Sequence, residues 1–242
     1  MAFDLTQYKN ETRQFTHTSG PLRFGLGVSG FEYFLFNTLR FLWRTFYQRR
    51  MSEAPDLPVP ILPATASFQQ KHVEHCRIFA DRIELLKTLP KGKVWAEVGT
   101  FKGEFARTIL DICEPSKLDL MDLTFDLVEK LGHVHESEIV TFYRGESSSS
   151  LLAQPDKKYD VIYIDAGHDL IDVARDADAA MKKLKDDGIL IFNDYIPFAY
   201  KEMRPYGVVA VVNSLVVHEG WEVACFAFQN NMYCDIALRR AA

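Results

Sequence analysis

The clearest chemical pattern in the sequence is a turn that combines an acidic residue with two glycines. In the segment VWAEVGTFKGEFARTIL, Glu97 ends an apolar stretch and is followed by Gly99 and Gly103. Gly99 lets a ligand approach the backbone closely, and Gly103 lets the chain turn into a helix. The amino terminus of that helix offers unpaired N–H groups. We therefore expect this turn to bind a cofactor.

The kind of cofactor follows from what this turn contains and what it lacks. A dinucleotide-binding turn reads G-x-G-x-x-G and a phosphate loop contains G-K-S or G-K-T, and neither pattern is present. The carboxylate of Glu97 repels phosphate groups, so it favours a ligand with a cationic or hydroxylated group. S-adenosylmethionine fits this description. Thr100 and Phe101, in the same turn, are predicted to contact it.

Two later segments add polar groups to the predicted cofactor site. In LDLMDLTFD, Asp122 falls at the end of the next strand, where a carboxylate can accept hydrogen bonds from ribose hydroxyls. Asp119 is the alternative, but it lies inside the apolar strand pattern. After the third strand, RGESSSS places Gly145, Glu146 and Ser147 where the adenine edge would lie, although this segment could also be a plain polar loop.

Alternating strands and helices position these residues. From Val94 onward, short apolar strands alternate with amphipathic helices, which is typical of a parallel sheet covered on both faces. Near the end of the chain, two strands flank Asn230 and Asn231, a pattern that predicts a tight hairpin and an antiparallel last strand. The predicted strands cover residues 93–98, 117–122, 139–144, 161–165, 189–193, 222–229 and 232–238.

The region before the predicted sheet divides into a helix and an extension. Apolar residues at helical spacing predict a helix from Phe68 to Leu89. The prolines of residues 55–63 predict an extended linker, because proline disfavours helix in the residue before it. We therefore expect an N-terminal extension over residues 1–67 and a cofactor-binding domain over residues 68–242.

An aromatic segment within this extension, FEYFLFNTLRFLWRTFYQRR, is predicted to form an amphipathic helix. Charged and polar residues such as Glu32 and Arg40 interrupt it, so it lacks the apolar length that a bilayer requires. The helix could pack on its own domain, form a homo-oligomer or lie on a membrane surface. Packing or oligomerisation is the favoured interpretation, because aromatic stripes are usually buried.

Composition restricts the class of partner. The chain has 242 residues, of which 48% are hydrophobic and 25% are charged, as in ordinary globular proteins. A formal net charge of -5 argues against nucleic acid as the partner and favours a small molecule. The four cysteines show no C-x-x-C spacing, so a zinc site is not indicated. Without a secretory signal at Met1, we expect free thiols and a cytoplasmic location.

A family resemblance emerges in the stretch IYIDAGHDLIDVARDADAAMKKLKDDGILIFNDY. The E-V-G-T-F-K-G turn, the I-D-A-G-H element and the N-D-Y at residues 193–195 occur in order and at appropriate spacing. Together they resemble the class I S-adenosylmethionine-dependent methyltransferases, and most of all their small-molecule O-methyltransferase branch, which contains the macrocin type. The resemblance covers residues 71–240. It implies an α/β fold with a Rossmann-like, doubly wound, mostly parallel sheet and an antiparallel strand from the C-terminal hairpin.

The resemblance also implies roles for individual residues. Glu97, Gly99 and Gly103 would line the methionine part of the cofactor, and Asp122 would bind the ribose. Asp165 would lie between cofactor and substrate. His168 would face the substrate and take a proton from an acceptor hydroxyl, since histidine side chains titrate near neutral pH. Alternatively, His168 caps the helix that follows it.

Some related enzymes hold a divalent metal ion with carboxylates at the ends of the fourth and fifth strands. Asp165, Asn193 and Asp194 could supply such oxygen ligands, for example to Mg²⁺. Asn193 departs from the family pattern, in which many members have Asp, and this weakens the prediction. The same acids could simply accept hydrogen bonds from the cofactor and the loop backbone.

These observations predict methyl transfer to a small molecule, most of all to a hydroxyl oxygen of a sugar or another natural product. A nitrogen or carbon acceptor is an alternative on the same fold, and so is a non-catalytic protein that binds the cofactor. After the fifth predicted strand, Lys201, Arg204 and Tyr206 lie in a loop that could recognise the acceptor.

Overall fold

The computed structural model describes residues 34–35, 37–42, 44–46 and 62–241. The chain divides into two compact units, Met1–Val59 and Pro60–Ala242, and each is described by itself. In the first unit the described residues are helical, which confirms this part of the predicted aromatic helix. Phe34, Leu39 and Phe41 are exposed there. Phe31 and most of the predicted linker lie outside the described residues, and the roles assigned to the extension stay predictions.

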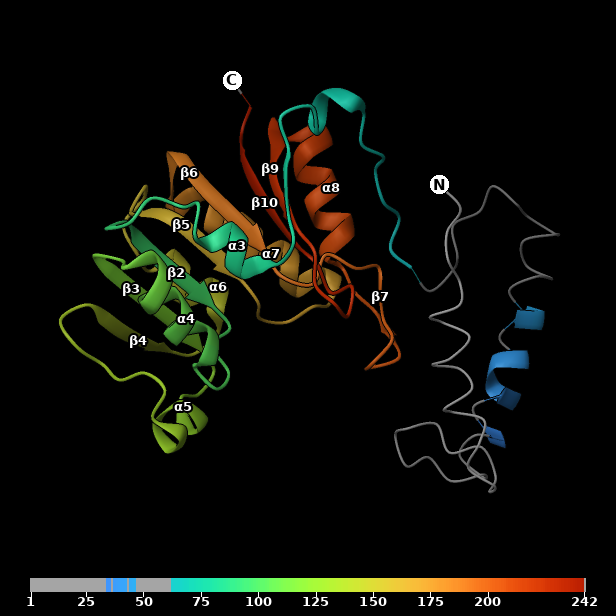
Figure 1. Cartoon of the computed structure of the whole chain (residues 1–242), viewed down its shortest axis with the longest axis horizontal. Coiled ribbons are helices and arrows are strands. Elements are labelled where there is room, and N and C mark those ends of the chain that lie inside the picture. The colour runs from blue at the N-terminus through green and yellow to red at the C-terminus, as the bar shows by residue number, and fades with distance from the viewer. Residues whose placement is uncertain (1–33, 36, 43, 47–61, 242) are drawn as a thin grey trace, which may run out of the picture. The chain divides into compact units, whose positions relative to one another are not determined.

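The second unit is built around an eight-stranded sheet in the order β1-β9-β10-β6-β5-β2-β3-β4 (Figure 1). Strand β10 is antiparallel to both of its neighbours, and all other pairs in this sheet are parallel. This confirms the predicted mostly parallel sheet and its antiparallel last strand. The strands are β1 (Arg77–Phe79), β2 (Val94–Val98), β3 (Lys117–Asp122), β4 (Val140–Arg144), β5 (Tyr159–Ile164), β6 (Leu184–Phe192), β9 (Trp221–Ala227) and β10 (Asp235–Arg240).

Both faces of the sheet are buried under helices. Successive side chains of a strand point to opposite faces, so neighbouring residues of one strand pack into different cores. In β2, Ala96 and Val98 belong to one core cluster, which includes residues of the helices α6, α7 and α8. Trp95 belongs to a second core cluster, which includes residues of α3, α4 and α5. The helices are α3 (Arg82–Leu86), α4 (Glu104–Cys113), α5 (Asp126–Leu131), α6 (Ser147–Leu152), α7 (Leu170–Lys183) and α8 (Val208–His218).

The strand order reverses between β2 and β5. From β2 the chain proceeds outward through β3 and β4, whereas β5 and β6 lie on the other side of β2. In sheets of this kind, ligands bind where the strand order reverses, outside the carboxyl ends of the strands. The turn after β2 and the loop after β5 therefore meet where a ligand site is expected.

The predicted helix from Phe68 to Leu89 was wrong. In its place the chain forms a short 3-10 helix, η1 (Gln70–His72), then strand β1 and helix α3. Phe68 and Cys76 pack against one core cluster, whereas Phe79 and Leu86 belong with the other. A single helix could not reach both faces of the sheet. Pairing of β1 with the edge of β9 replaces the expected helical hydrogen bonds.

The tight turn predicted at Asn230 and Asn231 was also wrong, although the hairpin itself is confirmed. The antiparallel pairing of β9 and β10 ends at Ala227 and Asp235, so residues 228–234 form a longer connection. Within it, the Asn231 side chain accepts a hydrogen bond from the Tyr233 amide at 3.1 Å. The connection also meets the loop after β6, where a short two-stranded sheet forms from β7 (Phe198–Ala199) and β8 (Arg204–Pro205).

The cysteines and the helices complete this description. All four cysteines are free, in agreement with the prediction, and three of them are buried. Among the described helices, none has the length and apolar character needed to cross a membrane.

Candidate active site

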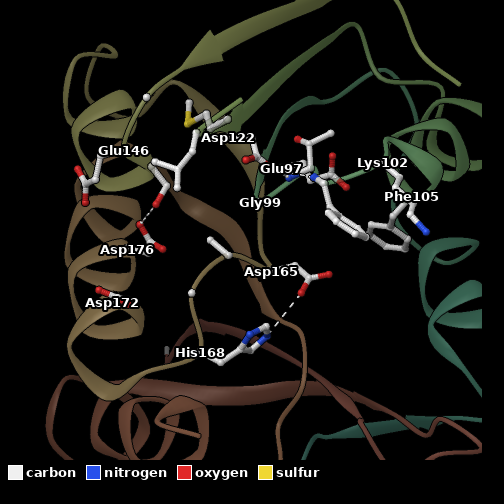
Figure 2. A pocket seen from close by; sticks show the side chains of 18 of the residues that line it. Glu97, Gly99, Lys102, Phe105, Asp122, Glu146, Asp165, His168, Asp172 and Asp176 are labelled. Carbon is white, nitrogen blue, oxygen red and sulfur yellow. Dashed lines mark hydrogen bonds and ion pairs between the residues drawn. The ribbon is translucent and has the colours of Figure 1, made fainter. Parts of the chain in front are cut away.

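A cavity of about 730 Å³ opens at the carboxyl ends of β2, β3, β4 and β5 (Figure 2). Most of the residues predicted to bind the cofactor line it. Those that do are Glu97, Gly99, Thr100, Phe101, Asp122, Gly145, Glu146, Ser147 and Asp165, and the predicted base His168 lines the cavity as well. Residues that the sequence analysis did not single out line it as well, and they include Lys102, Phe105, Asp172, Asp176 and Glu202.

Gly99 lines the cavity, but its missing side chain serves a different purpose from the one expected. Its φ is +92°, and a Cβ atom there would lie 2.1 Å from the carbonyl oxygen of Asp165 and 2.6 Å from the amide nitrogen of Ala166. The neighbouring chain, rather than a ligand, occupies the space beside its Cα. Gly99 thus lets the ends of β2 and β5 come together beside the cavity.

Gly103 does not line the cavity. It begins α4 with a φ of +80°, and a Cβ atom there would lie 3.0 Å from Cγ1 of Val134 and 3.3 Å from Cγ1 of Val128. The position needs glycine for its left-handed conformation and for this packing. Its predicted contact with the cofactor has no support in this placement, because its Cα faces apolar side chains.

The two acids considered for the ribose are clearly separated. Asp122 lies in the cavity wall, and its Oδ2 accepts hydrogen bonds from the amides of Thr100 and Phe101 at 2.9 and 2.7 Å. Its Oδ1 has, among the described residues, only a long contact of 3.5 Å with the amide of Thr124. Asp119 is buried away from the cavity, where it accepts a hydrogen bond from the Tyr159 hydroxyl at 2.6 Å. Only Asp122 is therefore placed to contact a ligand in the cavity.

Glu97 is the deepest acid of the cavity, with an exposed fraction of 1%. Burial, together with the negative charge of Asp165, raises the pKa of this carboxyl well above its ordinary value. The nearby Thr100 hydroxyl lowers the pKa of Glu97 in part, but within the described residues neither Oε2 of Glu97 nor this hydroxyl has a hydrogen-bond partner of good geometry. A buried polar atom without a partner is costly, so a donor or cationic group of a ligand would be stabilised here.

The loop after β4 provides backbone and hydroxyl groups rather than a free carboxylate. Gly145 has a φ of +133°, and its amide donates to the Asp122 carbonyl at 2.9 Å. The carboxylate of Glu146 caps α6 by accepting hydrogen bonds from the Ser149 amide at 2.8 Å and the Ser148 hydroxyl at 2.6 Å. The Ser148 hydrogen bond is the main cause that lowers the pKa of Glu146.

Helix α7 contributes two acids that the sequence analysis missed, Asp172 and Asp176. They lie four residues apart, which places them on one face of the helix. Asp176 is 2% exposed, and its Oδ1 accepts a hydrogen bond from the Ser147 hydroxyl at 2.7 Å. Burial raises the pKa of Asp176 to about 6. Asp176 lies among the buried residues Val173 and Ala177 of this helix, but the sequence around it carries no local signal that it faces a cavity.

His168 lies between two carboxylates at the other end of the cavity. Its Nε2 is 3.6 Å from Oδ1 of Asp165 and 3.5 Å from Oδ2 of Asp194, and it has no hydrogen-bond partner among the described residues. Burial and the charge of Asp165 raise the pKa of Asp194 to about 6. The expected alternative, a helix cap, does not describe this side chain, because Asp169 occupies the cap position of α7.

Asn193, one of the predicted metal ligands, forms hydrogen bonds with other side chains of the protein. Its amide nitrogen donates to the Tyr163 hydroxyl and to Oδ1 of Asp235, each at 3.1 Å. In the described parts of the chain, no group of three His, Cys, Asp or Glu side chains has the arrangement of a metal site. The metal role of Asp165, Asn193 and Asp194 stays a prediction, and it has least support at Asn193.

The loop residues expected to recognise an acceptor are mostly engaged with other residues of the protein. Arg204 pairs with Asp169 at 2.8 Å and with Glu202 at 2.6 Å. Tyr206 is buried, stacks on His168 and donates a hydrogen bond to Glu202 at 2.7 Å. Lys201 lies over the ring of Tyr233. Of this loop, Glu202 reaches the cavity.

Comparison with known proteins shows which fold and which domain family this chain resembles. The fold is similar to that of an S-adenosylmethionine-dependent methyltransferase from Mesorhizobium loti, with a TM-score of 0.50, 15% identity, and coverage of 66% of this chain and 96% of that chain. Residues 96–195 match the sequence model of a methyltransferase domain family. Over these residues the chain contains a methyltransferase domain. The matched residues include the turn after β2, the loop after β5 and Asn193 to Tyr195.

Other solved methyltransferases are similar to this one at comparable levels. One is the ribosomal protein L11 methylase from Lactobacillus delbrueckii subsp. bulgaricus, with 16% identity, coverage of 77% of this chain and 90% of that chain, and a TM-score of 0.49. Another is the N-methyltransferase NodS from Bradyrhizobium japonicum WM9, with 14% identity, coverage of 66% and 93%, and a TM-score of 0.48. A search among curated proteins gives no match.

The cavity of the methyltransferase fits S-adenosylmethionine on its own chemistry. The partnerless oxygens of Glu97 and Thr100 suit the amino and sulfonium groups, which carry positive charge. The weakly engaged Oδ1 of Asp122 suits ribose hydroxyls. S-adenosylmethionine carries no phosphate group, so it does not require a phosphate-loop motif, and this turn has none.

Proposed function

We propose that the methyltransferase transfers a methyl group to a hydroxyl oxygen of a small molecule, such as a sugar or another natural product. The observation that carries this proposal is the position of His168. Its Nε2 is a buried polar atom at the cavity wall without a partner among the described residues, and two carboxylates lie 3.5 and 3.6 Å away. The resemblance to the branch that contains macrocin-type O-methyltransferases supports the same acceptor class.

In this proposal the protein positions the two substrates and moves one proton. Glu97, Thr100 and Asp122 hold the cofactor, which supplies an electrophilic methyl group when bound. Nε2 of His168 accepts the proton of the acceptor hydroxyl while that oxygen forms its new bond to carbon. Asp165 and Asp194 then stabilise the imidazolium, because opposite charges within about 4 Å favour the charged form.

Magnesium is a second way to activate the acceptor hydroxyl. A divalent ion held by Asp165 and Asp194 would lower the pKa of a bound hydroxyl and orient it. The amide nitrogen of Asn193 donates to Tyr163 and Asp235, so this side chain is already held by other residues of the protein. If a chelator abolishes turnover and Mg²⁺ restores it, the ion takes over the activating role that we assign to His168.

The first test measures binding and turnover separately. Calorimetric titration with S-adenosylmethionine, with and without Mg²⁺, should show binding in both conditions. Release of S-adenosylhomocysteine should then be followed with a panel of sugars and other polyhydroxylated compounds, and with amines as the comparison class. No binding in either condition would reject cofactor use by this chain.

The role of His168 is tested by substitution. His168→Ala should lower turnover by about 10²- to 10⁴-fold, the usual contribution of a general base, with cofactor affinity unchanged. His75→Ala is the matched control, because His75 is exposed and lies outside the cavity. Unchanged turnover in His168→Ala would favour a nitrogen or carbon acceptor that needs no such base. Binding without turnover on any acceptor would favour a non-catalytic binding protein.

A further inference from the structure

One end of the cavity contains a buried carboxylate that the proposed mechanism does not use. In the view of Figure 2, Glu146, Asp172 and Asp176 lie along one side of the cavity, and Lys102 and Phe105 lie along the other. The acids of this side come from α7 and from the loop that begins α6. This side of the cavity lies next to the loop after β4, and β4 is one strand nearer the edge of the sheet than β3, which ends at Asp122.

The order of the strands determines which part of the cofactor reaches this side. With the charged methionine part at Glu97 and the ribose at Asp122, the base must continue outward toward β4 and α6. Backbone contacts connect these positions directly, because the Gly145 amide donates to the Asp122 carbonyl. An adenine ring bound in this cavity would therefore face the segment of Gly145 to Ser147 and the adjoining face of α7.

Among the side chains on this side, Asp176 has the acceptor best placed for the base. The carboxylate of Glu146 is engaged in capping α6, and Asp172 is exposed, so water competes for its oxygens. Asp176 is 2% exposed, and its Oδ1 accepts the hydrogen bond of the Ser147 hydroxyl at 2.7 Å. Within residues 62–241 the carboxylate of Asp176 accepts this one hydrogen bond, so its Oδ2 can accept another from a ligand.

We propose that Asp176 is the residue that selects adenine, by accepting a hydrogen bond from the exocyclic amino group of the base. This inference rests on the cofactor site described above and names the residue that determines its specificity for the base. A carboxylate offers acceptors only, so it attracts the amino group of adenine. It repels the carbonyl oxygen that hypoxanthine carries at the same position, and burial strengthens both effects.

The pKa of Asp176, raised to about 6 by burial, is consistent with such a position. The carboxyl is mostly ionised at neutral pH, and the causes that shift its pKa among the described residues include no positive charge. The nearby charges that act on it, those of Glu146 and Asp172, are negative and raise its pKa further. A neutral donor from the ligand would stabilise the ionised form without a buried cation.

The test compares two ligands that differ at one position of the base. S-adenosylhomocysteine carries the amino group, and S-inosylhomocysteine carries a carbonyl oxygen in its place. Calorimetric titration of the full chain should show a preference for the adenosyl ligand of about ten- to hundredfold, the range expected for a hydrogen bond to a charged group. Asp176→Asn should reduce this preference to near unity, because an amide can accept from one base and donate to the other.

Two features keep the experiment decisive. Asp178→Asn is the matched control on the same helix, since Asp178 is exposed, pairs with Lys182 and lies outside the cavity. The amide oxygen introduced by Asp176→Asn can still accept the Ser147 hydrogen bond, so folding should persist, as a thermal melt would show. If Asp176→Asn keeps the full preference for adenine, Asp176 does not select the base. If the wild-type protein binds neither ligand, the cofactor site itself is rejected along with this inference.

Discussion

The imidazole ring of His168 stacks on the phenol ring of Tyr206, with the ring centroids 4.4 Å apart and the ring planes 13° from parallel. Tyr206 is 2% exposed and comes from the loop that links β6 to α8. That loop is also attached to the segment of His168 by a backbone hydrogen bond, 2.7 Å long, from the Gly207 amide to the His168 carbonyl. The orientation of the proposed base therefore depends on a segment distant from it in the sequence.

Removal of the stacked ring should impair turnover without affecting cofactor binding. Tyr206→Leu should lower kcat by up to about tenfold, because aromatic pairs contribute about 0.5–1.5 kcal/mol beyond their buried area. Tyr206→Phe is the control, since it keeps the ring and loses only the hydrogen bond to Glu202. Steady-state kinetics combined with calorimetry checks this prediction. Equal loss in both variants would assign the effect to the hydroxyl instead.

Gly99 should be essential for folding rather than for ligand contact alone. Gly99→Ala places a Cβ atom 2.1 Å from the Asp165 carbonyl oxygen, so the ends of β2 and β5 must separate. We expect a loss of about 3 kcal/mol or more in the free energy of unfolding, as for other severe backbone clashes. Urea denaturation measures it.

Gly92→Ala is the control for Gly99→Ala. Gly92 also has a positive φ, +70°, but its Cβ position is open. The free energy of unfolding of this variant should fall only by the cost of the left-handed conformation, about 1–2 kcal/mol. Similar losses at both positions would mean that the contact with Asp165 is relieved by a small shift.

Gly103 should influence stability more than cofactor affinity. Gly103→Ala adds a methyl group 3.0 Å from Val134 at a φ of +80°, and we expect a cost of about 1–2 kcal/mol in the free energy of unfolding. The folded protein should bind S-adenosylhomocysteine with unchanged affinity, because this position faces Val128 and Val134. Calorimetry below the melting temperature tests this. A large loss of affinity in a folded variant would restore the cofactor contact predicted from the sequence.

The buried carboxyl of Asp176 should make stability depend on pH. Its pKa is about 6 in the folded protein, above the ordinary value of 3.8. Between these values the folded state binds a proton that the unfolded state does not, so raising the pH through this window destabilises the fold. We expect a loss of about 1–3 kcal/mol between about pH 4 and pH 7 in the ligand-free protein.

Asp176→Asn is the comparison that isolates this effect. An amide does not titrate, so the difference in free energy of unfolding between wild type and variant should grow in favour of the variant as the pH rises. Urea denaturation at several pH values gives both curves. Parallel curves for the two proteins would show that another group is responsible for the pH dependence.

Local sequence patterns predicted much of the sheet and much of the cavity wall. The strand β3 (Lys117–Asp122) has the predicted bounds, and Asp122 lies at its end as expected. Such strands are readable because both faces are buried, so they appear as short apolar runs between polar turns. Glu97 was found for a related reason, because it lies near the end of such a run and the carboxyl ends of parallel strands meet at one edge. Asp165 and His168 were found through the resemblance of the I-D-A-G-H element to a known family.

The region before β2 was misread because its apolar residues serve two different cores. Phe68 and Phe79 were assigned to one helical stripe, yet they pack on opposite faces of the sheet. Asp176 was overlooked because a charged residue on an amphipathic helix is usually exposed, and nothing local indicates that this one faces a cavity. The partner that marks it, Ser147, lies 29 residues earlier in the chain.

The amino-acid sequence by itself determined the order of strands and helices from β2 to β6, the glycine turn after β2 and the acids at the strand ends, because each depends on neighbouring residues. Only the tertiary structure decided what the side chains of these elements contact. It showed that the missing side chain of Gly99 allows β2 and β5 to approach each other, and that Asn193 donates a hydrogen bond to Asp235. It also placed Asp194 and Tyr206 next to His168. These contacts join distant segments, and their geometry follows from the packing of the whole sheet and its helices.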